Sequence, residues 1–131
     1  MADSVLDASA LLAYLRNEPG AERVLQAIVA GGAVMTTVNF GEVATWFMRN
    51  GADEVFVRSL RARLVFPLVS VDDDLAIRAA LLAPLTRSAG LSLGDRLCLS
   101  LAARLQAPTL TADRLWREVA QAAGITVELI R

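Results

Sequence analysis

The chain has 131 residues, with 13 basic and 14 acidic side chains, and 55% of its residues are hydrophobic. This length fits one domain spanning residues 1–131, and no apolar stretch is long enough for a membrane span. There is no histidine, no lysine and only one cysteine, which excludes histidine-activated serine or cysteine catalysis, ordinary zinc sites and lysine-containing phosphate loops. Hydrolysis is then left to carboxylates, whose oxygen ligands favour Mg²⁺ or Mn²⁺. The single cysteine suits a reducing compartment, so we expect a cytoplasmic protein.

Short apolar runs alternate with longer helical patterns along the chain, an order typical of a parallel sheet covered by helices. Strands are predicted over 4–6, 33–36, 68–71, 109–111 and 125–130. Helices are predicted over 9–17, 21–30, 39–49, 53–63, 72–83, 93–105 and 114–123. Pro84 is expected to end the helix that starts at Asp72. The pattern therefore predicts an α/β fold with a central parallel sheet of four to five strands.

Four acidic residues fall where a strand ends or where a neighbouring helix begins. Asp7 directly follows the first strand, and Asp113 follows the fourth. Glu42 lies in the first turns of the helix after the second strand, and Asp95 opens the helix that leads back to the fourth strand. Ligands of parallel α/β sheets bind beyond the carboxyl ends of the strands. We therefore expect the four carboxylates to meet at that edge.

Each of these acids also has a purely structural explanation. Asp7 and Asp113 could cap the helices that follow them. Glu42 could complete a capping box with Asn39, and Asp95 could favour the dipole at its helix start. Asp95 is the hardest to explain in this way, because its helix is apolar almost all round and a buried carboxylate is costly unless it is paired or bound to a metal. Capping explains each acid alone, but not why all four share one edge.

Three adjacent acids, Asp72, Asp73 and Asp74, also follow a strand and resemble a metal site. Adjacent residues in the first turn of a helix point in different directions. Asp72 fits an N-cap, with the other two near the positive end of the helix dipole. We interpret the triplet as structural. A metal-dependent phosphatase or Toprim-type nuclease built on it is disfavoured, because the expected glutamate after the first strand and a lysine are both missing.

Four segments match, in chain order, the motifs of a known family: residues 5–11, 36–42, 91–99 and 110–114. The most specific parts are Gly94-Asp95-Arg96 at a helix start and Thr111-Ala112-Asp113 after a strand. With these segments the sequence resembles a PIN-domain ribonuclease, in particular a VapC-type toxin of a toxin–antitoxin pair. The resemblance implies an α/β/α sandwich with strand order 3-2-1-4-5.

The resemblance also implies roles for individual residues. Asp7, Asp95 and Asp113 correspond to ligands of Mg²⁺ or Mn²⁺, and Glu42 to the fourth member of an acidic quartet. The hydroxyls of two further residues correspond to supporting groups, Ser9 and Thr111.

Arg96 and Arg114 stand next to predicted ligands in the sequence. They are candidate contacts for RNA phosphate, although each could equally be a salt-bridge partner. The implied activity is hydrolysis of RNA phosphodiester bonds by a metal-activated water, which leaves a 5′-phosphate. The implied partners are a second copy of the chain and a VapB-type antitoxin. The alternative is a non-catalytic PIN-like module that binds RNA or protein, and the intact quartet argues against it.

Overall fold

The computed structural model describes residues 2–131 and is built from five short strands and seven α-helices. In chain order, the elements are β1 (Ser4–Leu6), α1 (Ala8–Leu15), α2 (Ala21–Ala30), β2 (Ala33–Thr36), α3 (Thr37–Arg49), α4 (Glu54–Arg63), β3 (Leu68–Val69), α5 (Asp73–Thr86), a 3₁₀ turn (Arg87–Ala89), α6 (Leu93–Leu105), β4 (Thr109–Thr111), α7 (Trp116–Ala122) and β5 (Val127–Leu129). None of the helices within residues 2–131 is long and apolar enough to cross a membrane.

The five strands form one parallel sheet in the order β3-β2-β1-β4-β5. In the register, Val5 lies opposite Val34 on one side and Thr109 on the other. The predicted fold class and strand order are therefore confirmed. Because β1 stands between β2 and β4, the chain changes direction around it, and the end of β1 lies at the switch point where such sheets bind ligands.

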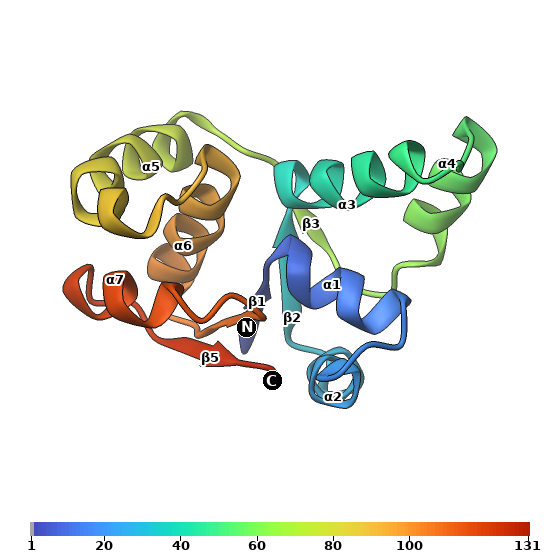
Figure 1. The fold of residues 1–131 in the computed structure, drawn as a ribbon, viewed down its shortest axis with the longest axis horizontal. Coiled ribbons are helices and arrows are strands. Elements are labelled where there is room, and N and C mark those ends of the chain that lie inside the picture. Colours follow the sequence, from blue (N-terminus) through green and yellow to red (C-terminus); the bar gives the residue numbers. More distant parts are fainter. Residues whose placement is uncertain (1) are drawn as a thin grey trace.

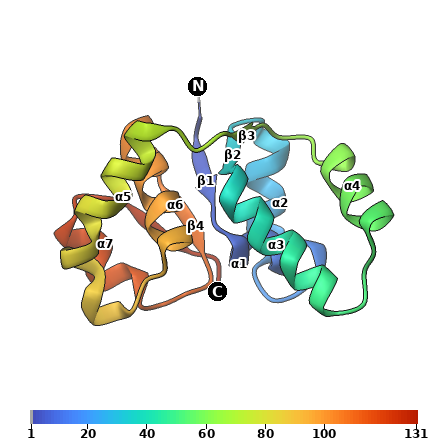
Figure 2. The same ribbon diagram turned by 90° about the horizontal axis from the view of Figure 1, so that it is seen from above.

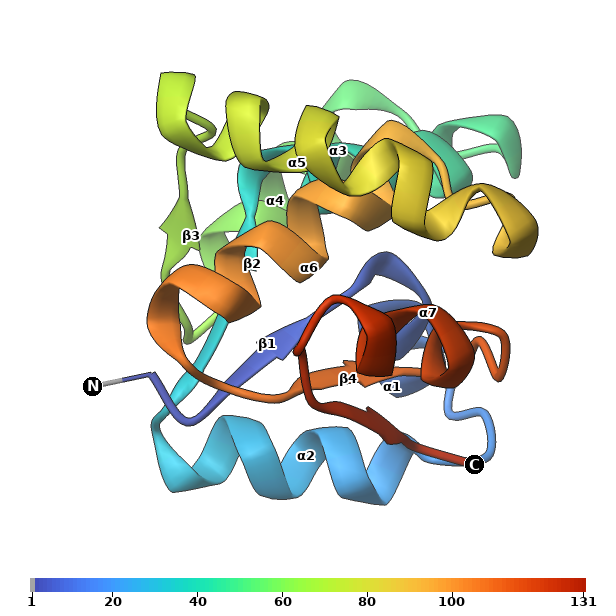
Figure 3. The same cartoon turned by 90° about the vertical axis from the view of Figure 1, so that its left-hand side faces the viewer.

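Helices cover both faces of the sheet. The ribbon shows α5, α6 and α7 on one side and α1 and α2 on the other (Figures 1 and 2). Val5 belongs to the core beneath α6, with Leu99 and Leu101, whereas Leu6 belongs to the opposite core, with Leu11 and Met35. Burial of alternate strand residues on opposite faces explains why the strands read as continuous apolar runs. In the side view α6 lies between α5 and the sheet (Figure 3).

The helix through Pro84 corrects one prediction. Pro84 does not end α5, which continues for two more residues to Thr86. A proline inside a helix removes one backbone hydrogen bond and crowds the carbonyl four residues earlier, which together cost about 3 kcal/mol. Thr86 supports this last turn by donating from Oγ1 to the Leu82 carbonyl at 2.9 Å. Leu75, Ala79 and Thr86 are buried, so packing against the rest of the molecule holds the helix together.

Several element boundaries also shift from the prediction. The helix predicted from residue 114 begins at Trp116, and the one predicted from residue 39 begins at Thr37. The last strand is limited to Val127–Leu129. Side-chain hydrogen bonds at the helix starts, described below, account for the first two shifts.

The structure confirms the structural interpretation of the acidic triplet. Asp72 caps α5 by accepting the Leu75 backbone N–H at 2.9 Å, and it is paired with Arg104 at the end of α6. Asp74 forms an ion pair with Arg78 one turn along the helix. Strand β3, which precedes the triplet, lies at the edge of the sheet, so these acids are removed from the central switch point.

Candidate active site

Asp7 is a buried carboxylate at the end of the central strand, with only 4% of the residue exposed. It caps α1, since its Oδ1 accepts the Ala10 backbone N–H at 2.8 Å. Ser9 Oγ donates to the same oxygen at 2.7 Å, and Thr111 Oγ1 donates to Oδ2 at 2.6 Å. Burial raises the pKa of Asp7 to about 6, although these hydrogen bonds act to lower it. Capping is therefore a real role of Asp7, but it does not remove the cost of the buried charge.

The hydroxyls of Ser9 and Thr111 join the two central strands at this edge. Thr111 Oγ1 accepts the backbone N–H of Asp113 at 3.0 Å while it donates to Asp7. Ser9 Oγ accepts the backbone N–H of Ala112 at 2.9 Å. The two hydroxyls thus hold the turn after β4 against the end of β1. Through these bonds they contact the Asp7 carboxylate and the backbone of residues 112 and 113.

Glu42 lies on α3 and does not form the capping box with Asn39 considered above as its structural explanation. The cap of α3 is Thr36, whose Oγ1 accepts the Asn39 backbone N–H at 3.0 Å, so Asn39 lies inside the helix. From there Asn39 Nδ2 donates to Glu42 Oε1 at 2.8 Å and to the carbonyl of Gly94 at 3.0 Å. Thr36 Oγ1 also donates to Asn39 Oδ1 at 2.6 Å, which fixes the orientation of the amide. Asn39 therefore holds Glu42 against the start of α6.

Gly94 provides the space that Glu42 occupies. A Cβ at this position would stand 2.6 Å from Glu42 Oε2 and 2.7 Å from its Cδ, which is too close for any real contact. Sequence reasoning missed the roles of Asn39 and Gly94. The Thr36-x-x-Asn39 spacing was available as a signal for the cap, but the contact between α3 and α6 depends on packing that spacing does not reveal.

Asp95 is the third residue of α6 and belongs to a capping box with Ser92. Ser92 Oγ accepts the Asp95 backbone N–H at 3.2 Å, and the Ser92 backbone N–H donates to Asp95 Oδ2 at 3.0 Å. The middle of α6, residues 97–102, is buried, whereas Asp95 is only half-buried because it lies in the first turn of the helix at the sheet edge. Arg96 does not neutralise it through an ion pair. Arg96 Nη1 instead donates to the Ala79 carbonyl of α5 at 2.8 Å.

Asp113 closes the turn after β4 and does not cap a helix directly. Its Oδ1 accepts the backbone N–H of Leu115 at 3.0 Å, and its carbonyl accepts that of Trp116. This local turn delays the start of α7 to Trp116. Arg114 is exposed beside it.

The four carboxylates lie within electrostatic range of one another. Burial raises the pKa of Asp95, and the charge of Asp113 raises it further. Burial likewise raises the pKa of Glu42, with a contribution from the charge of Asp95. Asp95 also contributes to the raised pKa of Asp7. Four acids from β1, α3, α6 and the turn after β4 are thus brought to one edge, where they disfavour each other's ionised form.

The chemistry of these side chains suits a divalent cation that prefers oxygen ligands. Among residues 2–131, Glu42 Oε2, Asp95 Oδ1 and Asp113 Oδ2 have no hydrogen-bond partner, while the second oxygen of each carboxylate is held. As the side chains stand, no three acids or cysteines of the described chain are close enough together to enclose a metal ion. Side-chain rotation would have to bring the free oxygens together around a cation.

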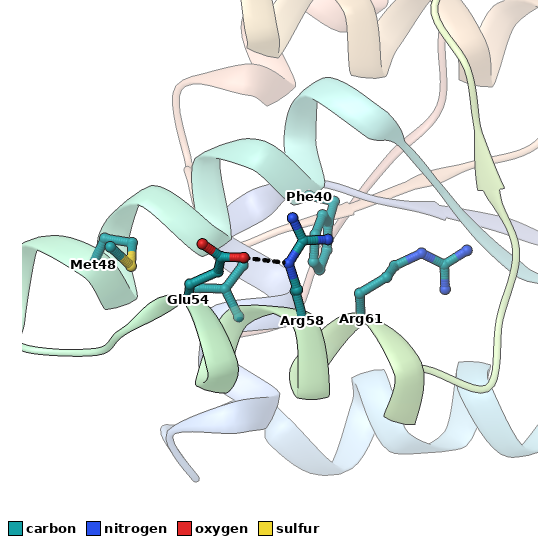
Figure 4. Close-up of a pocket in the computed structure, with 6 residues that line it drawn as sticks. Phe40, Met48, Glu54, Arg58 and Arg61 are labelled. Carbon is teal, nitrogen blue, oxygen red and sulfur yellow. Dashed lines mark hydrogen bonds and ion pairs between the residues drawn. The ribbon is translucent and has the colours of Figure 1, made fainter.

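A separate hollow of about 570 Å³ lies between α3 and α4 (Figure 4). Its acid, Glu54, is paired with Arg58 at 2.8 Å, and both side chains come from α4. None of the four predicted acids lines this hollow. It offers no unpaired carboxylate for the predicted chemistry.

The comparisons with known proteins identify the family. Residues 4–122 match the model of the PIN domain, and the chain therefore belongs to the PIN-domain family. No curated protein matches the sequence.

Solved structures from toxin–antitoxin systems share the fold. A chain from a toxin–antitoxin complex of Klebsiella pneumoniae is 18% identical, with 98% of each chain covered and a TM-score of 0.73. A chain from a DNA-bound VapBC complex of Salmonella typhimurium is 15% identical, with 100% of each chain covered and a TM-score of 0.76. A chain of VapBC-5 from Mycobacterium tuberculosis is 22% identical, with 100% of this chain and 99% of that chain covered and a TM-score of 0.60.

The raised pKa of Asp7 predicts an unusual pH dependence of stability. The folded state holds this proton more tightly than the unfolded chain, so stability falls by roughly 3 kcal/mol as pH rises from the ordinary pKa of 3.8 to about 6. Asp7→Asn can still cap α1 but cannot ionise. In metal-free buffer we expect this variant to be more stable than wild type near neutral pH, with the advantage shrinking as pH falls through that range. Urea unfolding across pH measures the difference.

Asp73→Asn, at an exposed position of α5, is the matched control for the loss of one carboxylate. A difference between Asp7→Asn and wild type that stays constant across pH would contradict the assignment of the buried charge to Asp7.

Gly94→Ala should disturb Glu42 without unfolding the protein. The added methyl displaces the Glu42 carboxylate, while alanine favours the helix by about 1 kcal/mol over glycine. We expect the melting midpoint without metal to be unchanged or raised, and the further rise produced by Mn²⁺ to be smaller than in wild type. Differential scanning fluorimetry with and without Mn²⁺ measures both quantities.

Gly41→Ala is the matched control, because nothing lies within 4 Å of a Cβ at that position of α3. An equal Mn²⁺ response in both variants and wild type would show that the position of Glu42 is irrelevant to cation binding.

Proposed function

We propose that this PIN-domain chain is a VapC-type toxin, a ribonuclease that hydrolyses RNA phosphodiester bonds with Mg²⁺ or Mn²⁺. The single observation that carries the proposal is the gathering of Asp7, Glu42, Asp95 and Asp113 at the switch point of the sheet. Two further facts support it. The family is that of PIN domains, and chains from toxin–antitoxin complexes, one of them a VapBC complex, share the fold over nearly their whole length. An RNA substrate and a single free cysteine are both compatible with action in the cytoplasm.

Asp7, Asp95 and Asp113 are the proposed ligands. Their mutual repulsion gives the site its affinity, because a divalent cation replaces like-charge repulsion with attraction. When bound, the metal orients the phosphate, lowers the pKa of an attacking water and neutralises developing charge. The hydroxyls of Ser9 and Thr111 keep Asp7 oriented toward the site while the other carboxylates adjust.

Glu42 has a different proposed role from the three aspartates. Its Oε1 is held by Asn39, which leaves Oε2 free. Burial and the charge of Asp95 raise the pKa of Glu42, so its carboxylate is a better proton acceptor than an exposed one. We assign to Oε2 the acceptance of a proton from the attacking water. Arg96 and Arg114 remain proposed phosphate contacts, Arg114 being the more exposed of the two.

Two apolar surfaces suit the proposed partners. A groove between α1, α3 and α4, lined by Tyr14, Leu15, Phe47, Phe56 and Leu64 among others, could receive an amphipathic helix of a VapB-type antitoxin. On α5, residues one turn apart expose a separate apolar stripe, which suits an isologous contact with a second copy of the chain: Ile77, Leu81 and Leu85. The related chains from Klebsiella pneumoniae and Salmonella typhimurium belong to toxin–antitoxin complexes, which supports an antitoxin as the partner.

The proposal predicts metal-dependent cleavage of RNA that requires the quartet. Asp7→Asn and Asp95→Asn should each reduce cleavage of total RNA by about 100-fold or more, since even groups that merely orient metal ligands are worth 10- to 100-fold. Asp73→Asn is the matched control and should cut like wild type, because Asp73 is exposed on α5 and remote from the switch point. Gel assays with Mg²⁺ or Mn²⁺, and with excess chelator, measure the rates.

Full activity in chelator, or equal cutting by wild type and both quartet variants, would refute the proposed mechanism. RNA that is bound but never cut under any metal condition would favour the alternative, a non-catalytic PIN-like binding module.

A further inference from the structure

A groove of about 560 Å³ runs from the candidate active site along the space between α1 and α3. Glu42 belongs both to this groove and to the acidic quartet. Ala8, the residue after Asp7, lines the groove on the side of α1, together with Leu12. The groove is therefore continuous with the catalytic edge, and its volume suits a single small ligand group.

Trp46 forms the wall of this groove one helical turn beyond Glu42 on α3. Its indole is partly exposed and is held by two neighbours. The guanidinium carbon of Arg16 lies 4.2 Å from the ring centroid, and Phe47 packs against the ring edge-on at a centroid distance of 5.1 Å. Arg16 is not among the residues that line the groove, so it braces the ring from outside. A partly exposed aromatic ring fixed in this way loses little conformational entropy when a flat ligand stacks on it.

Arg49 stands at the far end of the groove, about 10 Å along α3 from Glu42 at the rise of a helix. It is exposed, and no carboxylate within residues 2–131 forms an ion pair with it. The groove thus presents the Glu42 carboxylate at one end, an aromatic surface in the middle and a free positive charge at the other end.

We propose that this groove is a nucleotide subsite, in which Trp46 stacks on an unpaired base next to the scissile phosphate and Arg49 contacts the next phosphate of the strand. The inference rests on the proposed ribonuclease function and assigns the residues that would hold an unpaired base and its neighbouring phosphate beside the catalytic edge. Aromatic side chains that accept bases, flanked by arginines for the backbone, are the means by which proteins hold single strands without reading their sequence.

A polypeptide is the less suitable occupant. An amphipathic helix needs a row of apolar contacts. The groove beside α4 offers seven aromatic or large aliphatic side chains for this purpose, whereas only Leu12, Val38 and Trp46 line the present groove. The present groove mixes Glu42, Thr45, Trp46 and Arg49, an order of charges that complements a metal-bound phosphate, a base and a second phosphate.

The test measures binding of a short, mixed-sequence single-stranded RNA carrying a fluorescent label. All proteins carry Asp7→Asn to prevent cleavage, because Asp7 is buried and contributes least surface to the RNA. Trp46→Leu, which keeps the apolar volume but removes the ring, should weaken binding about 10-fold. Trp46→Phe should retain most of the affinity. Arg49→Gln should lower the slope of log affinity against log salt by about 0.7. The control Arg58→Gln, at an exposed position of α4 outside this groove, should not.

Intrinsic tryptophan fluorescence distinguishes direct stacking of RNA on Trp46 from a purely structural role of this residue. The chain has two tryptophans, and Trp116 is only 1% exposed, so quenching by RNA reports on Trp46. Trp46→Phe should abolish the quenching while RNA still binds. If RNA binds the parent without quenching and Trp46→Leu has the same affinity, the proposed subsite is wrong, while the ribonuclease proposal stands. A polypeptide is then the better candidate for binding in the groove. If no single-stranded RNA binds the parent, both the subsite and the proposed function fail.

Discussion

The burial of the Asp7 carboxylate is the constraint around which the candidate site is organised. Asp7 ends the central strand, is 4% exposed and has a pKa raised to about 6. An ionised group in such a place is expensive unless hydrogen bonds or a cation compensate it. The hydroxyls of Ser9 and Thr111 provide part of that compensation, and they come from α1 and β4, the two elements nearest the end of β1. The part of the desolvation cost of the Asp7 carboxylate that these hydrogen bonds do not offset favours the binding of a cation at this site.

The strand order explains why the other acids gather around Asp7. β1 lies between β2 and β4, so the element after each neighbour delivers a side chain to the same edge. β2 leads directly into α3 with Glu42, and β4 leads into the turn with Asp113. α6 brings Asp95 because its first turn faces α3, where Asn39 binds the Gly94 carbonyl. Stability is supplied elsewhere, by the apolar cores on the two faces of the sheet, which allows the edge to carry repelling charges.

Sequence reasoning predicted what depends on local pattern and chain order. Apolar runs gave the strands, and the position of Asp7 after the first strand located the edge. It failed where packing decides the outcome. Pro84 lies inside α5 because tertiary contacts outweigh the lost hydrogen bond and the steric crowding that a proline brings to a helix. Asn39 could not be recognised as the residue that holds Glu42, since its second partner, Gly94, is 55 residues away along the chain.

Capping and the proposed metal role of the acids are not alternatives in this fold. Asp7 and Asp95 each accept a backbone N–H at the start of a helix, and both carboxylates also lie at the crowded edge. Hydrogen bonds hold one oxygen each of Asp95, Glu42 and Asp113. The second oxygen of the two aspartates is left for the proposed cation, and that of Glu42 for the proton of the attacking water. The same edge opens into the groove of Trp46, so the chemistry and the proposed binding of a single strand share one continuous surface.

The most direct test of this account is an anomalous diffraction map from a crystal of the protein grown with Mn²⁺. We expect a manganese peak coordinated by the carboxylate oxygens of Asp7, Asp95 and Asp113, with Glu42 beside it. Two results would contradict the claim that this edge is a metal-dependent active site. One is a peak confined to Asp72–Asp74, and the other is a map in which the four carboxylates are well resolved but no anomalous peak lies among them.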